Sequence, residues 1–441
     1  MDNKSRFKKN IFSGLTNEFS KIIINLFYPP LMILFWGVEN FGIWIFFTSI
    51  PSILTTLSIN VNKASINEII INIHNKKKKA EIFQNTILFT IINLLLFTIV
   101  IFLFLLLDID FQTLKNFELK DAKIIFFLLI MTIYIKFIEN LFFIELISRG
   151  RLYIKEYIAI FEDYSSKILI ILVGIITNNL IFAATAFLLI CVIKFIILLK
   201  FYANLENKLK FSIKLTSNQG LLKLIKISIG HISNIYSNII RHSGVIFVSG
   251  IFLSAPLVGY ISTVKTIFYF MPTRFFSKIS HPIQYELTSL FSKKKIFNIN
   301  KIFFKSLFFS FLAVTFFLIL SIYYGKDIYN YWTNYKYNIT SLFLLIIVLD
   351  AIIFILRFYF IEIFLISINK NIKLGSIEFF LSFMSLILLY YNFYNGQSLE
   401  FSFFCILCFS CINLLISLLI CLLNFNISNI YKSEIYNKKK K

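Results

Sequence analysis

The sequence predicts an all-α integral membrane protein with about 12 transmembrane helices, in two pseudo-symmetric six-helix lobes around a central cavity. Three observations predict this architecture. Hydrophobic residues make up 58% of the 441 residues, and the mean hydropathy is +0.80. The apolar runs reach the roughly 20 residues that a helix needs to cross a bilayer. Lysine concentrates in every second connection between these runs.

The apolar runs are expected to be helices because lipid offers no partner to backbone N–H and C=O groups. Continuous runs such as 87–107 also lack the alternation of polar and apolar residues that barrel strands show. The expected spans are 14–36, 40–60, 84–107, 124–147, 157–177, 181–200, 228–252, 256–275, 303–324, 341–366, 375–393 and 401–423.

The distribution of basic residues predicts the orientation. If the amino end is inside, the inner connections hold 32 Lys and Arg, the outer connections hold 5, and the spans hold 7. Cytoplasmic loops of membrane proteins carry this excess of positive charge. Both termini are therefore expected to be cytoplasmic. The charged amino end precedes an apolar run of full spanning length, so no cleavable signal peptide is expected.

The two halves of the chain look alike. Each half opens with a helix that carries a polar stripe, and its second helix runs into a long basic loop. A break at the loop 200–226 gives an N-terminal six-helix lobe, 1–212, and a C-terminal six-helix lobe, 213–441. Parallel halves of this kind are a known plan of transporters, with the substrate site between them.

Several function classes are excluded by what the sequence lacks. The net charge is +22, but a basic stripe with stacking aromatics on a soluble fold is missing, so no nucleic-acid partner is expected. The chain has neither a GxxxxGK phosphate loop nor an HExxH motif. Cys405, Cys408 and Cys411 lie three apart in an apolar run without nearby His, Asp or Glu, so no metal is expected. We therefore expect neither an enzyme nor a cofactor.

Polar side chains within the spans are the candidates for function, because an ionisable group at membrane depth is costly unless it faces a cavity or a partner. They fall at helical spacing on the first two helices of each half, which suits a water-filled cavity between the lobes. The candidate substrate-binding residues are Lys21, Asn25, Asn234, Asn238, Arg241, Lys265, Tyr269 and Arg357.

Three of these candidates predict the charge of the cargo. Arg241 and Lys265 lie near mid-span, where a long side chain cannot easily reach the membrane surface, and Arg357 lies in a later span. A cavity that contains them would be electropositive and would attract anions. Phosphate is the expected group because Arg and Lys bind it well.

The remaining charged residues in the spans admit two interpretations. Lys136 with Glu139, and Asp163 with Lys167, are spaced for neutralisation within one helix, and Lys194 is expected to reach toward the cytoplasmic surface. The functional alternative is a carboxylate that takes up H⁺ or Na⁺ and couples it to a conformational change. Asp350 and Glu18 are the candidates for that role.

One segment resembles a known family. Tyr28-Pro29-Pro30-Leu31 leads to Gly37-Val38-Glu39-Asn40-Phe41-Gly42-Ile43-Trp44, with a looser echo at Ser254 to Tyr260. This resembles the opening of Wzx-type O-antigen flippases, in the polysaccharide-transport branch of the multidrug/oligosaccharidyl-lipid/polysaccharide exporter superfamily. The helix count, the six-plus-six division and the inside termini agree with that family along the whole chain.

The resemblance implies a function and its setting. Such proteins translocate an undecaprenyl-diphosphate-linked oligosaccharide, an O-antigen or capsule repeat unit, across the bacterial inner membrane by alternating access. The implied partners are this lipid-linked substrate, membrane lipid and the glycan polymerase machinery. The family offers no motif that assigns roles residue by residue, so the basic residues named above come from this chain alone.

Two other functions stay open. A cation-coupled multidrug exporter of the same superfamily would need a cavity dominated by carboxylates, and Arg241 and Lys265 argue against it. A membrane polysaccharide polymerase or ligase would need a large outer loop with catalytic Arg or His. The expected outer loops are short, and all four histidines are expected inside or in spans.

Overall fold

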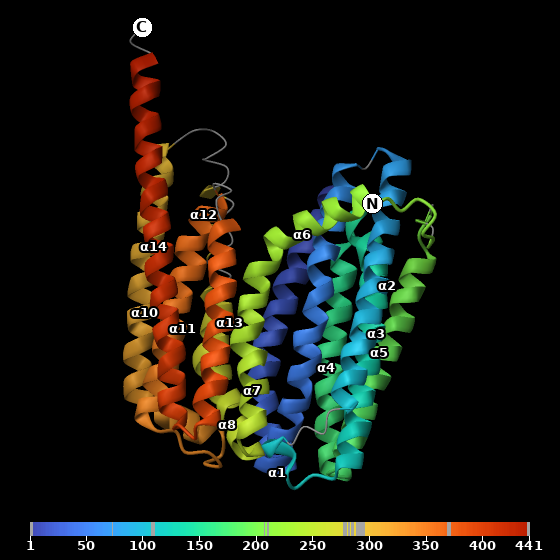
Figure 1. The fold of residues 1–441 in the computed structure, drawn as a ribbon, viewed down its shortest axis with the longest axis vertical. Helices are drawn as coiled ribbons and strands as arrows, with labels where there is room; N and C mark the ends of the chain where they lie inside the picture. The colour runs from blue at the N-terminus through green and yellow to red at the C-terminus, as the bar shows by residue number, and fades with distance from the viewer. Residues whose placement is uncertain are drawn as a thin grey trace. The chain divides into compact units, whose positions relative to one another are not determined.

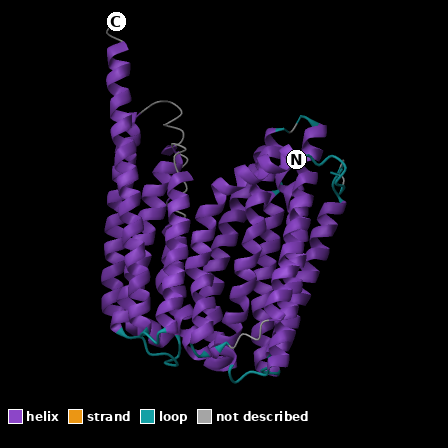
Figure 2. Ribbon diagram, viewed as in Figure 1, coloured by secondary structure: helices purple, strands orange, loops and turns teal. Residues whose placement is uncertain are grey.

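In the computed structural model, the described part of the chain consists of helices joined by loops and turns (Figure 2). Among the described residues, eight helices are long and apolar enough to cross a membrane. The all-α prediction is confirmed. The described residues are 3–72, 74–106, 111–206, 208–209, 211–276, 280, 283, 286–287, 296–367 and 372–438.

Contacts between residues divide the chain into two compact units, Met1–Tyr260 and Ile261–Lys441. Helix α8 (Ala255–Lys265) crosses from the first unit into the second. The six-plus-six lobe boundary at 212/213 stays a prediction, because it concerns the likeness of the two halves and not the density of contacts. The first unit contains α1 (Asn3–Ile71), α2 (Lys76–Leu106), η1 (Gln112–Leu114), α3 (Leu119–Ser148), α4 (Leu152–Ile176), α5 (Leu180–Ala203), α6 (Asn218–Ile239), η2 (Ile240–Gly244) and α7 (Val245–Phe252).

Each of the twelve expected spans lies on a helical segment, to within one residue at its ends. Three of the expected spans are not among the helices that are apolar enough to cross a membrane by composition, because they carry charged or polar stripes. These three are 157–177, 228–252 and 256–275. The elements after α8 are η3 (Thr266–Phe270), α10 (Ile296–Trp332), α11 (Ser341–Leu356), η4 (Arg357–Glu362), α12 (Ile363–Ser367), α13 (Ile372–Tyr394) and α14 (Leu399–Lys438).

Helix α1 contains the first two expected spans, joined at a kink. Gly37 has φ 76° and ψ 169°, outside the helical region. This backbone conformation is essentially restricted to glycine. Trp44, seven residues later, donates a hydrogen bond from Nε1 to the Tyr28 hydroxyl at 2.9 Å, so the two arms of α1 are joined across the kink. The kink explains why 14–36 and 40–60 behave as separate spans.

The helices of the first unit pack side by side around α1 (Figure 1). α1 packs on α3 and α4, and α5 packs on α3 and α4 in turn. α1 also approaches the start of α8, where a Cβ added to Gly42 would lie 1.7 Å from the Ala255 carbonyl oxygen. Only glycine permits such an approach between backbones. Two segments on which the family resemblance rests, 37–44 and 254–260, therefore contact each other.

The described residues of the loop 204–217, between α5 and α6, are hydrogen-bonded to the ends of α2 and α3. The Leu209 N–H donates to Glu145 at 3.1 Å, and the Leu215 N–H donates to Gln84 at 2.7 Å. Buried side chains of the first unit thus satisfy the loop backbone, as buried polar backbone requires. Further contacts join Arg149 to the Glu206 carbonyl, Ser217 to Glu81 and Asn85, and Phe211 to Phe83 and Phe142.

The second unit is built on α11, which packs against α10, α14 and η3, while α13 packs on α14. These helices run alongside one another in Figure 1. Phe303 and Phe364 pack with tilted rings whose centres are 4.9 Å apart, in an apolar cluster that includes Leu365 and Leu374. This cluster lies beside η4 and holds the segment that carries Arg357.

Candidate functional site

Each of the three cavity cations predicted from the sequence, Arg241, Lys265 and Arg357, lies at a π-helical turn. Arg241 is within η2, Lys265 immediately precedes η3, and Arg357 begins η4. All three side chains are buried. A π-turn is rare, and it occurs mostly as a single-turn bulge at functional sites. The described residues therefore associate the candidate cations with the irregular parts of their helices.

The second unit brings three predicted site residues together through an aromatic ring. Lys265 Nζ lies 5.3 Å from the centre of the Tyr269 ring and 6.0 Å from that of Phe403. The Tyr269 and Phe354 ring centres are 5.5 Å apart, and the Arg357 guanidinium carbon lies 5.5 Å from the Phe354 ring. Cations over aromatic faces are stabilised by the ring quadrupole. These cations and aromatic rings can together present positive charge and flat faces to a ligand within the second unit.

Arg357 also has two carboxylate partners. Glu362 lies 3.3 Å from its guanidinium, and Glu378, on α13, forms a short ion pair with it. All three side chains are at most 1% exposed. The sequence predicts that Arg357 supplies positive charge to a hydrated cavity. In the structure, the two neighbouring carboxylates already neutralise the Arg357 charge. Asp350, the coupling candidate two turns earlier, accepts a hydrogen bond from Ser410.

The candidates of the first unit lie in different settings. Asn25 accepts a hydrogen bond from Lys167 of α4 at 3.0 Å, so Lys167 joins two helices instead of pairing with Asp163 within α4. Lys21 and Glu18 are half-buried on α1. Arg241 lies in the middle of the span 228–252, two residues before Ser243, whose hydroxyl accepts a hydrogen bond of 2.6 Å from Ser52 of α1. Asn234 and Asn238 fall on α6, but their side chains lie outside the described residues.

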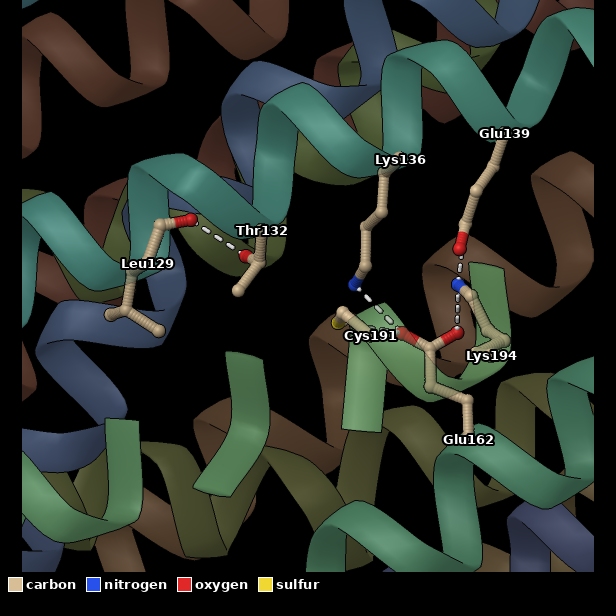
Figure 3. Close-up of polar contacts among 7 residues, drawn as sticks. All are labelled: Leu129, Thr132, Lys136, Glu139, Glu162, Cys191 and Lys194. Atoms are coloured by element: carbon tan, nitrogen blue, oxygen red, sulfur yellow. Dashed lines mark hydrogen bonds and ion pairs between the residues drawn. The ribbon is translucent and has the colours of Figure 1, made fainter. Parts of the chain in front are cut away.

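Four charged residues between α3, α4 and α5 form a set that the sequence did not predict, the ion-pair chain Lys136–Glu162–Lys194–Glu139 (Figure 3). Lys136 Nζ lies 3.1 Å from Glu162, and Lys194 Nζ lies 2.7 Å from Glu162 and 2.6 Å from Glu139. The predicted Lys136–Glu139 pairing is wrong, because both residues of α3 bind partners on other helices. Lys194 does not reach the membrane surface, since it is 4% exposed.

The ion-pair chain lines a cavity of about 270 Å³ within the first unit. The cavity wall also contains apolar side chains such as Phe143 and Ile158, and the polar residues Asn62, Asn140 and Lys155. The only signal of this site in the sequence is that α3, α4 and α5 each carry charge at membrane depth. Which charges meet depends on the rotation of each helix, and the sequence alone does not fix that rotation.

Comparisons by sequence identify no relative: no family model matches the chain, and no curated protein matches it. Comparisons of structure do find similar folds. The lipid II flippase MurJ in an inward closed conformation matches with a TM-score of 0.65 and 18% identity, over 97% of this chain and 93% of MurJ.

Two further matches are transporters of the MOP superfamily. An inward-facing multidrug resistance MATE transporter matches with a TM-score of 0.63 and 12% identity, over 92% of this chain and 99% of that one. A Pyrococcus furiosus transporter, described as having a binding pocket of reversed polarity, matches with a TM-score of 0.56 and 12% identity over 94% and 96%. The chain therefore has the two-lobe, all-helical membrane fold that MATE transporters and MurJ share.

Proposed function

We propose that this chain is a flippase that moves an undecaprenyl-diphosphate-linked oligosaccharide across the bacterial inner membrane by alternating access. The observation that carries the proposal is the position of Arg241, Lys265 and Arg357 at three π-turns, buried in a fold that MurJ also has. Buried guanidinium and ammonium groups are suited to a diphosphate. Tyr269, next to Lys265, would add a flat face for a sugar ring.

We assign different roles to the three cations. Lys265 and Arg241 are proposed to contact the diphosphate. Arg357, held by Glu362 and Glu378, is proposed to fix the helix around η4 and to orient Phe354 beneath the cationic group. Both termini are proposed to be cytoplasmic, as the distribution of Lys and Arg favours.

A multidrug exporter is the second candidate, and the MATE match favours it on fold. An organic cation needs carboxylates that lack a basic partner. Four carboxylates in the interior of the described helices, those of Glu139, Glu162, Glu362 and Glu378, each bind Lys or Arg. The charge pattern therefore supports an anionic cargo over a cationic one.

The test is transport by the purified full-length protein in liposomes. We expect a fluorescent undecaprenyl-diphosphate oligosaccharide to cross to the inner leaflet with wild-type protein. Arg241→Ala and Lys265→Ala should each lower the rate about tenfold or more, because one hydrogen bond to a charged group contributes about 1.5–3 kcal/mol. The readout is protection of the label from an impermeant quencher.

Lys223→Ala is the matched control. Its side chain is 58% exposed and pairs with Glu68 at the surface, at 2.8 Å, so transport should keep its wild-type rate. A cationic dye tested in the same liposomes separates the two candidate functions. Export of the dye without movement of the lipid would contradict the flippase and support the exporter.

A further inference from the structure

Glu139 stands out among the charged groups that the proposed transport path leaves unused. Its Oε2 binds Lys194 at 2.6 Å, but its Oε1 is buried and has no hydrogen-bond partner in the described structure. An anionic oxygen buried without a donor is costly. We propose that Glu139 is a proton-uptake site inside the first unit, reached through the cavity that it lines, and that its protonation is coupled to transport.

The cavity supplies the route for the proton. Its volume of about 270 Å³ leaves room for several water molecules, and its polar lining residues offer them partners. The groups that line it range over four helices, so the site belongs to the interior of one unit. The titratable, charged or amide groups that line the cavity or lie near Glu139 are Lys136 and Asn140 on α3, Lys155 and Glu162 on α4, Cys191 and Lys194 on α5, and Asn62 on α1.

The same surroundings select a proton over a metal ion. A sodium ion needs several oxygen ligands, and here two ammonium groups, those of Lys136 and Lys194, would repel it. The described residues contain no group of three or more His, Cys, Asp or Glu that could hold a metal ion. A proton requires one oxygen atom, and Glu139 Oε1 offers it.

Protonation changes the balance of the ion-pair chain. A hydronium ion in the cavity gives its proton to Oε1 and leaves as water, while the carboxylate becomes a carboxylic acid. The four side chains then carry a net charge of +1 instead of zero. Lys194 keeps Glu162 at 2.7 Å but loses its anionic partner on α3. The attachment of α5 to α3 weakens, and this is the step that we propose is coupled to movement of the substrate.

The uptake is tested on the purified protein by infrared difference spectroscopy between mildly alkaline and mildly acidic buffer. Wild type should show a carboxylic-acid C=O band that rises with acidity, and Glu139→Gln should lose that band. Glu145→Gln is the matched control on the same helix. The Glu145 carboxylate already binds Arg149, Tyr202 and the Leu209 N–H, so the band should persist in this variant. A band that persists in Glu139→Gln, or is missing from wild type, overturns the proposal.

The coupling rests on the proposed function and is tested separately, in the liposome assay with an imposed pH gradient. The gradient should accelerate transport by the wild type and leave Glu139→Gln at the rate it has without a gradient, while Glu139→Asp should recover part of the acceleration. If the infrared band titrates but no lipid moves, the flippase fails and the proton site stands. If the lipid moves and the gradient has no effect on wild type, the coupling is wrong.

Discussion

Arg357 is one buried cation that pairs with two buried carboxylates, those of Glu362 and Glu378. Removing the cation would take from Glu362 and Glu378 the guanidinium that both carboxylates bind. Breaking a buried ion pair by removing one partner costs about 3–5 kcal/mol. We expect Arg357→Met to lower the free energy of unfolding by about that amount, measured by thermal or denaturant unfolding of the purified protein in detergent.

The exposed Lys223 gives the comparison, since Lys223→Met removes a surface pair and should cost less than about 1 kcal/mol. The triple variant Arg357→Met, Glu362→Gln, Glu378→Gln should recover most of the loss, because no buried charge remains. If the triple variant is no more stable than the single one, charge is not the reason why Arg357 matters.

The identity of the buried cations could be predicted from the sequence, but their partners could not. Arg241, Lys265 and Arg357 are recognisable because each interrupts an apolar run. Glu378 is fully buried and Glu162 is 16% exposed, yet their spacing along the chain does not reveal that they meet Arg357 and Lys194 from neighbouring helices. Pairs within one helix are the natural expectation for Lys136 and Lys167, and packing between helices overrules it.

At the scale of the element, apolar length predicts the helices well and their irregularities poorly. The spans follow from hydrophobic runs, because lipid forces the backbone into helices. The π-turns η2, η3 and η4 have no such cause in composition. Each inserts extra backbone within an otherwise regular span, so it depends on how neighbouring helices pack. The kink in α1 is visible in the sequence because a glycine stands between two runs.

The kink in α1 is expected to depend on the glycine at position 37. A methyl group added to its Cα meets no neighbour, so only the backbone conformation opposes a larger residue. We expect Gly37→Ala to destabilise the protein by about 1–3 kcal/mol, since this region of φ and ψ is essentially restricted to glycine. Unfolding in detergent measures the change.

Gly14 is the control within the same helix. A Cβ added there would also have nothing within 4 Å, but the Gly14 backbone is helical. Gly14→Ala should therefore be neutral or stabilising, by up to about 1 kcal/mol. Equal losses in the two variants would mean that the kink is not what Gly37 provides.

For the whole molecule, the excess of Lys and Arg in the expected inner connections predicts the orientation in the membrane. Lys77 follows the first pair of expected spans and Lys115 follows the third, and both side chains are exposed. In a variant without the five native cysteines, Lys115→Cys should react with an impermeant maleimide in cells whose outer membrane alone is permeable. Lys77→Cys should react only after the inner membrane is opened. The reverse pattern would place the termini outside.

The fixed loop 204–217 has a mechanical consequence for the molecule. A slack tether would let the helices on either side of it move independently. In this loop, Glu206, Leu209, Leu215 and Ser217 are hydrogen-bonded to α2 or to the end of α3, so the loop is a rigid connection. Any swing of α6 must therefore pivot beyond Ser217, and strain from that swing reaches α3, the helix that carries Lys136 and Glu139.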